Sequence, residues 1–437
     1  MGGTPALEML NQVRGEVVTA QSPTYDEARA VYNAMIDRRP LAIVRPVDAS
    51  DVSTAVRAAA EGGLELAVRA GGHSVPGFGT VDDGIVIDLS SMKRVHVDPG
   101  ARVAHVQAGC TWGDFDREAS GFGLATTGGI ISTTGVSGLT LGGGIGYLAR
   151  AHGLSCDNLR SAEVILADGT SVTASSDSHP DLFWALRGGG GNFGVVTSME
   201  FDVHPVDTIY GGPMFFELDV AEDVLRTYRE WIVDAPREMG GFPAFQIAPP
   251  LPFIPEERHG EPFALLVTCF NGPDDEAEKL LSPFRDIAHI VAEHVGRMPY
   301  AGLNSAFDGL LPAGLQHYWK ANFVDELTDA AIAAHLQHGP KVPAMQSTMH
   351  LYPINGAVHD VAPDETAFAY RGATFAPVVA GMWADPADNA DNIRWVRDYY
   401  EATAPFSAEG GYVNFMADDD QDRVRVNYGA NYDRLAD

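Results

Sequence analysis

The chain has 437 residues, which is more than one hydrophobic core usually serves, so two domains are expected. Its 59 acidic and 29 basic residues give a formal net charge of −30, and a surface of that sign repels nucleic acid and anionic membranes. Neither is therefore an expected partner. The sequence has no apolar run near the roughly 18–20 residues that span a bilayer, and residues 1–20 do not read as a signal peptide, so a cytoplasmic location is expected.

The three cysteines, Cys110, Cys156 and Cys269, are odd in number and widely spaced. This spacing fits neither a disulfide framework nor a thiolate metal site, so we expect buried thiols and no metal.

The first elements predict an α/β unit that leads into a glycine loop. Helices and strands alternate in it: a helix over 25–39, a strand over 42–46, a helix that Ser50 caps and Gly62-Gly63 ends, and a strand over 64–69. The loop Arg69-Ala70-Gly71-Gly72-His73-Ser74 follows, at the position where open α/β sheets bind ligands.

Two adjacent glycines, Gly71 and Gly72, allow backbone conformations that other residues avoid, and they bring bare N–H groups close to a bound group such as a phosphate. His73 lies at the mouth of this loop. The alternative is a plain glycine turn with an exposed histidine, because short glycine motifs often occur by chance.

A second dense set of glycines lies between Thr126 and Gly153, after a helix over 112–120 that Thr111 opens. Gly144 to Ala149 fit the G-x-G-x-x-A pattern of a dinucleotide-binding fold, but no β-branched strand leads into them. We prefer a closely packed backbone that lies along a flat cofactor, with the dinucleotide fold as the alternative.

From about Asp207 glycine becomes sparser and the pattern changes. Strand-like runs alternate with helical runs, the former at 214–218, 263–270, 317–323, 347–352 and 377–383, the latter at 220–232, 274–289, 328–338 and 389–400. Such alternation favours one mainly antiparallel sheet covered by helices. Residues 411–415 are expected to form a further short strand.

Several motifs in fixed order carry a family resemblance. They are Arg69–Ser74, Gly84–Leu89, Gly129–Gly146, Gly153–Asn158, Leu182–Gly188, Gly191–Val196, Tyr412–Phe415 and Tyr428–Tyr432. Together they resemble the FAD-binding domain of the vanillyl-alcohol oxidase superfamily and, within it, the berberine-bridge-enzyme-like oxidases.

The resemblance implies an α+β, two-domain PCMH-type FAD-binding fold. Residues 1–206 would form the FAD-binding domain, 207–403 a substrate-binding cap domain of antiparallel sheet covered by helices, and 404–437 a segment that returns to the FAD domain. Relatives normally continue past the match to residues 431–435, whereas this chain stops at Asp437, which leaves open whether its C-terminus is complete.

The resemblance also implies that FAD is bonded covalently to the ring of His73, with the pyrophosphate on the amides of Gly71, Gly72 and Ser74. Members with a second link have a cysteine where this chain has Ile131, so a single link is expected and Cys156 is expected to be a packing thiol. The full set of implied cofactor-binding residues is Arg69, Ala70, Gly71, Gly72, His73, Ser74, Gly79, Thr134, Gly135, Ser137, Gly138, Gly142, Gly143, Gly144, Gly146, Gly153, Asp157, Asn158, Gly194, Val195, Val196, Tyr412 and Asn414.

The activity that the resemblance implies is transfer of a hydride from a CH–OH group of an alcohol, sugar or secondary metabolite to FAD, with O2 as the acceptor. Thr134 stands where the family has a small branched residue that gates oxygen, and its size is compatible with an oxidase. The alternatives are a flavin dehydrogenase with another acceptor and a flavin-holding protein without turnover.

Four residues are candidates for the base that takes the proton from the substrate hydroxyl. Tyr412 comes first, because it matches the tyrosine proposed as base in sugar-oxidising relatives. A phenol that titrates near 10 needs a nearby cation or hydrogen-bond donor to act as a base at neutral pH. His350 and Tyr352 share one face of a strand and come second. Lys320, the candidate cation, comes third. The alternatives are a core tyrosine, a polar sheet surface and a solvated lysine.

Overall fold

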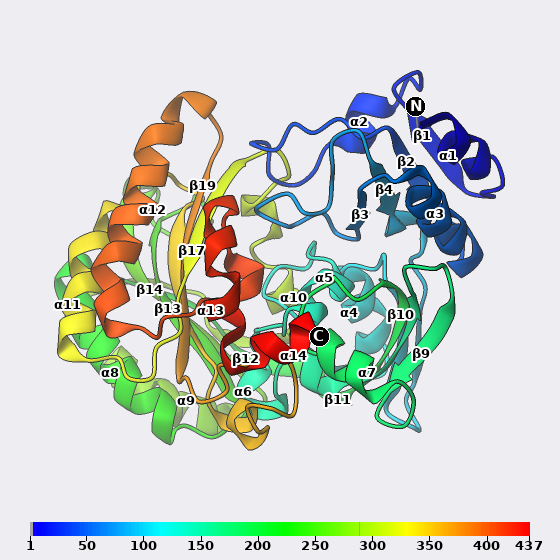
Figure 1. The fold of residues 1–437 in the computed structure, drawn as a ribbon. Helices are drawn as coiled ribbons and strands as arrows, with labels where there is room; N and C mark the ends of the chain where they lie inside the picture. The colour runs from blue at the N-terminus through cyan, green and yellow to red at the C-terminus, as the bar shows by residue number, and fades with distance from the viewer. Residues whose placement is uncertain (1–2, 288) are drawn as a thin grey trace.

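The computed structural model describes residues 3–287 and 289–437. Figure 1 shows two halves side by side, with the chain up to about residue 206 on the right and most of the later residues on the left. The last helices, in red, lie between the halves. Within the described residues, none of the helices combines the length and the apolar character that crossing a membrane requires.

The first half contains two main sheets. The four-stranded sheet has the order β1 (Glu16–Thr19), β2 (Ala42–Arg45), β4 (Ile85–Asp88), β3 (Leu66–Arg69). The five-stranded sheet has the order β5 (Val95–Asp98), β6 (Val103–Gln107), β10 (Val195–Asp202), β8 (Leu159–Ile165), β9 (Ser171–Ser175), and a separate pair joins β7 (Leu124–Ala125) to β11 (His204–Pro205). The helices are α1 (Gly3–Leu10), α2 (Tyr25–Arg29), α3 (Ala49–Gly62), α4 (Trp112–Ser120), α5 (Val136–Leu141), α6 (Ala149–His152) and α7 (Pro180–Leu186).

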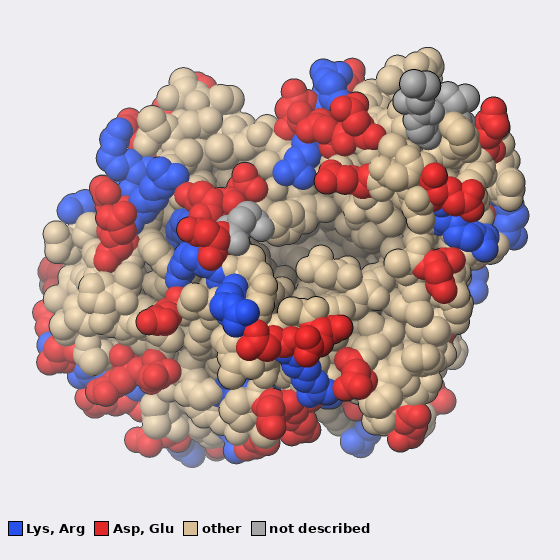
Figure 2. All heavy atoms as spheres, in the orientation of Figure 1, with Lys and Arg blue, Asp and Glu red and all other residues tan. Residues whose placement is uncertain are grey.

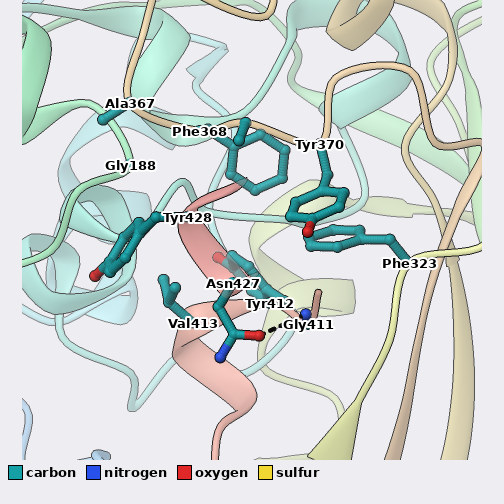
Figure 3. Close-up of a pocket in the computed structure, with 11 residues that line it drawn as sticks. Gly188, Phe323, Ala367, Phe368, Tyr370, Gly411, Tyr412, Val413, Asn427 and Tyr428 are labelled. Carbon is teal, nitrogen blue, oxygen red and sulfur yellow. Dashed lines mark hydrogen bonds between the residues drawn. The ribbon is translucent and has the colours of Figure 1, made fainter. Parts of the chain in front are cut away.

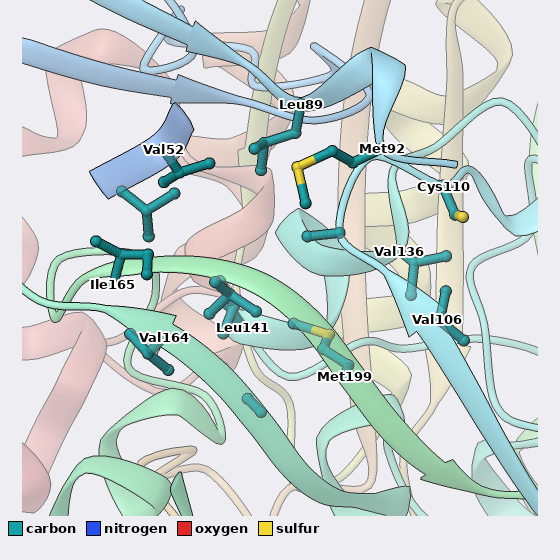
Figure 4. Packing of buried hydrophobic residues seen from close by; sticks show 14 of the residues in the cluster. Val52, Leu89, Met92, Val106, Cys110, Val136, Leu141, Val164, Ile165 and Met199 are labelled. Atoms are coloured by element: carbon teal, nitrogen blue, oxygen red, sulfur yellow. The ribbon is translucent and has the colours of Figure 1, made fainter. Parts of the chain in front are cut away.

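One hydrophobic core joins these elements. Val52 of α3, Val106 of β6, Val164 of β8 and Met199 of β10 belong to a single buried cluster (Figure 4). Burial of such side chains contributes about 1.5–3 kcal/mol each, so this core holds the glycine loops against a rigid scaffold.

The predicted unit before the glycine loop is confirmed in outline, with one difference in capping. Asp48, and not Ser50, caps α3, because its side chain accepts hydrogen bonds from the backbone N–H groups of Ser50 and Asp51. Gly63 ends the helix with φ +60°, a conformation that favours glycine. β2 and β3 both run parallel to β4, which lies between them.

The predicted helix over 25–39 is wrong beyond Arg29. Ala30 is extended, with φ −62° and ψ 140°, and the chain then crosses toward the second half. There the Asn33 side chain accepts a hydrogen bond from the backbone N–H of His317 and donates one to its carbonyl oxygen. These contacts override the local helical pattern.

The second half is built on an eight-stranded antiparallel sheet, as expected. Its order is β15 (Ile290–Glu293), β12 (Thr208–Phe216), β14 (Pro262–Phe270), β13 (Met239–Ile247), β18 (Thr348–Pro353), β19 (Phe375–Trp383), β17 (Gln316–Ala321), with β16 (Gly296–Pro299) also paired to β12. The helices are α8 (Ala221–Asp234), α9 (Asp274–Arg285), α10 (Tyr300–Asn304), α11 (Asp329–His338) and α12 (Asn389–Thr403), followed by α13 (Val424–Tyr428) and α14 (Tyr432–Ala436).

Strand β13 has no counterpart among the expected strands. Its sequence contains Gly240, Gly241 and Pro243, which normally argue against a central strand. It nevertheless pairs with β14 along its whole length and with β18 over three residues. Long-range pairing therefore decides this element.

The two faces of the large sheet have different neighbours. Met349, Leu351 and Val379 pack with residues of α8, α11 and α12 in one cluster. Tyr352, Ala376 and other residues of the opposite face pack with first-half residues in another cluster. The second face is therefore the one that looks onto the glycine loops.

The strand predicted over 411–415 is wrong. Val413–Phe415 form a single 3-10 turn after Tyr412. The Gly411 N–H donates to the Asn427 side chain at 2.8 Å, and Asn414 donates to the Leu139 carbonyl at 2.9 Å. Side-chain partners thus replace a sheet ladder in this segment.

Asp116 of α4 generates a prediction about stability. It accepts a hydrogen bond of 2.6 Å from Asn304 of α10, and burial raises its pKa to about 7. A carboxyl group with a raised pKa in the folded state binds more protons there than when unfolded, so its contribution to stability falls as the pH rises from about 4 to about 7. We expect Asp116→Asn to abolish this fall in stability with pH. The new amide can also donate to the side-chain oxygen of Asn304, which has no hydrogen-bond partner among the described residues.

Urea unfolding at pH 5 and pH 8 tests this prediction. The variant should gain roughly 1–3 kcal/mol over the wild type at pH 8 and less at pH 5. Glu118→Gln, an exposed change on the same helix, is the control and should behave like the wild type at both pH values. A difference that does not grow with pH would contradict the assignment.

Candidate active site

The loop after β3 and the start of α5 meet backbone to backbone. A Cβ atom on Gly71 would lie 2.4 Å from the Gly135 nitrogen, and one on Gly135 would lie 2.5 Å from the Gly71 nitrogen. Gly72 has φ +72°, which also favours glycine. The two glycine motifs are thus in direct contact although they are far apart in the sequence.

His73 is held on three sides where these motifs meet. Its ring stacks on Tyr32, with centroids 3.9 Å apart and planes at 14°. Thr133 Oγ1 lies 3.2 Å from Nε2, and Thr134 Oγ1 lies 3.4 Å from Nδ1. Burial lowers the pKa of His73 to about 4, so the imidazole is neutral at pH 7 and one ring nitrogen has no proton.

Arg69 stabilises the backbone at the start of this loop. It is buried, pairs with Asp88 at 2.8 Å and donates to the carbonyl oxygens of Ala28 and Ala30. A Cβ atom on Gly79 would lie 3.6 Å from the Arg69 side chain, and the Ser74 hydroxyl accepts a hydrogen bond from the Phe78 N–H. Ala70, between Arg69 and the glycines, packs against Gly135.

The glycines of α5 and its continuation divide into two groups. Gly138 is exposed, and a Cβ atom there would meet no atom within 4 Å, so open space lies over this helix. The others pack tightly. Gly142 faces Asn414, Gly143 faces Phe368, Gly144 faces Ser155, Gly146 faces the Gly128 carbonyl oxygen, and Ser137 donates to the Ala108 carbonyl.

Asp157 and its neighbours form a buried polar cluster that ties the halves together. Arg371 of the second half donates to both carboxylate oxygens of Asp157, at 2.6 and 2.7 Å, while Gly153, with φ +77°, leaves room for that carboxylate. The Asn158 side chain donates to two backbone carbonyls and lies 2.6 Å from His204. These residues shape the site through the scaffold.

Gly194, Val195 and Val196 also belong to the scaffold. Gly194, with φ +142°, packs on Val164 and Ile165, and the two valines start β10 inside the first-half core. These three residues therefore act through the packing of β10, and their role in cofactor binding stays a prediction.

Tyr412 is buried and packs against the glycines that follow α5, at Gly143 and Gly144. Its phenolic oxygen accepts hydrogen bonds from the Gly144 N–H at 2.8 Å and from the Asn414 side chain at 2.9 Å. Burial raises the pKa of Tyr412, and the two donors lower it to a smaller extent. A small cavity behind Tyr412 is surrounded by the rings of Phe323, Phe368 and Tyr370 (Figure 3).

His350 and Tyr352 are paired on the inward face of β18. His350 Nδ1 lies 2.6 Å from the Tyr352 hydroxyl. Burial lowers the pKa of His350 to about 3 and raises that of Tyr352, so both groups are neutral at pH 7. Phe415 contacts both this pair and Tyr412: its ring centroid lies 6.0 Å from that of Tyr352 and 4.8 Å from that of Tyr412.

Lys320 lies on the other face of the sheet. Its ammonium group pairs with Asp419 at 2.7 Å and with Asp420 at 2.6 Å. Alternation along β17 turns Lys320 and Tyr318 toward the helices, away from Tyr412. The structure therefore does not bring Lys320 together with the other three candidates; it fastens the C-terminal segment to the sheet.

Tyr32, Thr133 and His317 were missed by the sequence reasoning. Tyr32 stands between His73 and His317, with a centroid distance of 4.8 Å to the latter. Their neighbours come from distant segments, so the sequence carries no local signal for them.

These features fit a flavin. Figure 2 shows a hollow between the halves, over α5 in the orientation of Figure 1. Bare backbone at Gly72 and Gly138 and a neutral imidazole at His73 suit a flat group that carries a phosphate and can be joined to a ring nitrogen. The fold and the site thus define a class, the flavin-binding oxidoreductases.

Comparison with known proteins gives the family. A model of the FAD binding domain matches residues 40–175. The uncharacterized FAD-linked oxidoreductase YgaK of Bacillus subtilis (strain 168) is 33% identical over 436 residues, which cover 97% of this chain and 93% of the relative. The chain belongs to the FAD-linked oxidoreductases.

Solved structures agree with this assignment. 6-Hydroxy-D-nicotine oxidase from Arthrobacter nicotinovorans has a TM-score of 0.85 and 25% identity, with 99% of this chain and 95% of that chain covered. BBE-like #28 from Arabidopsis thaliana has a TM-score of 0.86 at 24% identity with the same coverage, and it shows the shared fold. The expected resemblance to the berberine-bridge-like group and its two-domain fold is confirmed.

The buried pair of Asp157 and Arg371 generates a second prediction. Both side chains are less than a tenth exposed, so Asp157→Asn would leave the guanidinium without its counter-charge. We expect the free energy of unfolding to fall by about 3–5 kcal/mol in urea denaturation.

A double variant and a surface control complete this test. Asp157→Asn combined with Arg371→Met should recover part of the loss, because it removes the unpaired charge. Asp360→Asn, which breaks an exposed pair with Arg237, should cost less than about 1 kcal/mol. Equal effects of Asp157→Asn and Asp360→Asn would contradict the prediction.

Proposed function

We propose that this protein is an oxidase that holds FAD covalently at His73, oxidises the CH–OH group of a small molecule and uses dioxygen as acceptor. FAD, when bound, supplies the ring system that accepts the hydride. The observation that carries the proposal is the neutral His73 ring, held by Tyr32, Thr133 and Thr134 above bare backbone. Family membership as an FAD-linked oxidoreductase favours an enzyme over a flavin-holding protein without turnover.

Thr133 and Thr134 orient the His73 ring. A hydroxyl group can donate to one ring nitrogen or accept from the other, so the two threonines can hold a single tautomer. Stacking on Tyr32 fixes the plane of the ring. The unprotonated nitrogen has the lone pair that would bond to carbon once the hydroxyl group facing it turns away. Ile131 offers no thiol for a second link, so we propose one covalent attachment.

His350 and Tyr352 form the proposed proton acceptor. The Tyr352 oxygen takes the proton of the substrate hydroxyl while its own proton passes over 2.6 Å to His350 Nδ1. Burial disfavours both a free Tyr352 phenolate and a free imidazolium at His350, so the pair accepts the proton in concert with oxidation of the CH–OH carbon. This order differs from the one expected from the sequence, which put Tyr412 first.

We assign Tyr412 an anchoring role. Its oxygen already accepts hydrogen bonds from the Gly144 N–H and the Asn414 side chain. These bonds hold the turn at Val413–Phe415 next to Gly144. Its own hydroxyl hydrogen remains available to a bound group.

Replacing His73 tests the covalent attachment. His73→Ala removes the nucleophilic nitrogen, so its intact mass should equal that of the polypeptide alone, whereas the wild type should carry the additional mass of FAD. Acid precipitation should leave the yellow colour in the supernatant for the variant and in the pellet for the wild type. His96→Ala, an exposed histidine on β5, is the control and should behave like the wild type. Wild-type protein with pigment but polypeptide mass would disprove the link.

Anaerobic stopped-flow mixing tests the proton acceptor. His350→Phe and Tyr352→Phe should slow flavin bleaching by an alcohol substrate by about 10²–10⁴-fold. Because the pKa of His350 is about 3, this step in the wild type should not depend on the His350 charge above about pH 5. His335→Phe removes a similar buried pair, 2.8 Å from Tyr399 on the helix side, and should leave bleaching unchanged. Unchanged bleaching in both site variants would contradict the role.

The acceptor is decided by a second mixing step. Rapid reoxidation of the reduced protein by O2 is expected for an oxidase. Slow reoxidation, with rapid turnover of a quinone or dye, would favour the alternative, a flavin dehydrogenase.

A further inference from the structure

Three neighbouring strands of the large sheet, β18, β19 and β17, carry a strip of inward side chains that we call the trough. His350 and Tyr352 of β18 stand on one side of it, and His317 and Trp319 of β17 stand on the other. Strand β19 lies between them and pairs with both. Two of its inward residues are alanines: Ala380 is aligned with Trp319 and Ala376 with Tyr352.

The β17 wall carries polar atoms that lack partners. Neither ring nitrogen of His317 has a hydrogen-bond partner among the described residues, and the side chain is only 2% exposed. The indole nitrogen of Trp319 likewise has none. Leaving a buried polar group unpaired costs about 1–3 kcal/mol, so such groups in a site call for a bound molecule.

The proposed flavin link does not satisfy these atoms. Tyr32 stacks on His73 and also contacts His317, so His317 lies near the proposed point of attachment. A flavin joined to His73 would present its methyl-bearing edge there, which has no hydrogen-bonding atom. The His317 and Trp319 nitrogens would then remain available to a substrate.

The trough is uncharged and aromatic. The inward side chains of β17, β18 and β19 are His317, Trp319, Ala321, Thr348, His350, Tyr352, Ala376, Val378, Ala380 and Met382, and none is a carboxylate, an ammonium or a guanidinium. Burial keeps the imidazole of His317 neutral, because it lowers the pKa to about 3.

Two more aromatic rings flank these side chains: Phe242 on β13, next to β18, and Phe415, which contacts residues of both β17 and β18. Phe242 lies 4.8 Å from Tyr352, and Phe415 lies 5.8 Å from Trp319, between ring centroids. Such walls favour a flat ring through stacking and disfavour an ion that would have to lose its hydration.

We propose that the substrate is an uncharged aromatic compound with a hydrogen-bond acceptor, such as a carbonyl oxygen, that binds the Trp319 and His317 nitrogens. The inference rests on the proposed oxidase function for the reaction itself, but it concerns binding alone. Trp319 and His317 are specificity-determining residues on the wall opposite the proposed proton acceptor.

Calorimetry on the purified holoprotein tests binding with probes that have no hydroxyl to oxidise. The probes are 4-methylacetophenone, 4-ethyltoluene, which lacks the acceptor, 4-methylbenzoate, which is charged, and 1-(4-methylcyclohexyl)ethanone, which lacks the aromatic ring. The aromatic ketone should bind about 3–10-fold more tightly than 4-ethyltoluene, because one hydrogen bond to a desolvated donor is gained. It should also bind more tightly than the saturated ketone and the carboxylate.

Two variants locate the donor. At least one of the single variants Trp319→Phe and His317→Phe should lose the preference for the ketone over 4-ethyltoluene, so that the ratio of the two affinities falls to about one. The affinity for 4-ethyltoluene should stay unchanged. Trp231→Phe, which loses an indole N–H bonded to Leu280 on the helix side, is the matched control and should keep the preference.

The proposal would be overturned if the preference survives in both wall variants, or if the carboxylate or the saturated ketone binds as tightly as the aromatic ketone. These outcomes are separate from a failure of the oxidase function. If 4-methylacetophenone binds as expected but benzylic alcohols do not bleach the flavin anaerobically, the substrate class stands and the proposed reaction fails.

Discussion

Close contact between two stretches of bare backbone, at Gly71 and Gly135, is the constraint on which the site depends. A Cβ atom on either residue would fall within 2.5 Å of the other's nitrogen, so any side chain would force the segments apart. Only at this separation do Thr133 and Thr134 reach the two ring nitrogens of His73. The cores of the first half supply the rigidity, and the glycines supply the close approach.

Burial without a counter-charge gives the two key imidazoles their chemistry. His73 and His350 both have strongly lowered pKa values, so each presents a neutral ring at pH 7. In His73 the free lone pair suits a covalent link, and in His350 it suits proton transfer from Tyr352. The large sheet separates these two histidines from polar groups that have a structural role. Lys320 and the His335–Tyr399 pair lie on its other face, toward the helices.

Much of the fold could be predicted because its signals are local. Thr111 begins α4, as predicted, and the structure shows a capping box with Asp114. The helix predicted over 328–338 forms as α11, with Thr328 as its N-cap. Alternating runs located most strands of the large sheet. The errors occur where distant partners decide, as at Asn33, which binds His317, and at β13, where pairing on both sides overrides Gly241 and Pro243.

For the site, the sequence by itself determined the cofactor class and the residues that have a motif around them, such as His73, because several glycine motifs in fixed order are specific. It also placed His350 and Tyr352 on one face through the two-residue period of a strand. Only the tertiary structure decided that Lys320 faces away, that Tyr32 stacks on His73 and that His317 and Trp319 line the opposite wall. The physical reason is that periodicity records a residue's own backbone, whereas burial, charge pairing and stacking depend on neighbours that the chain brings together only by folding.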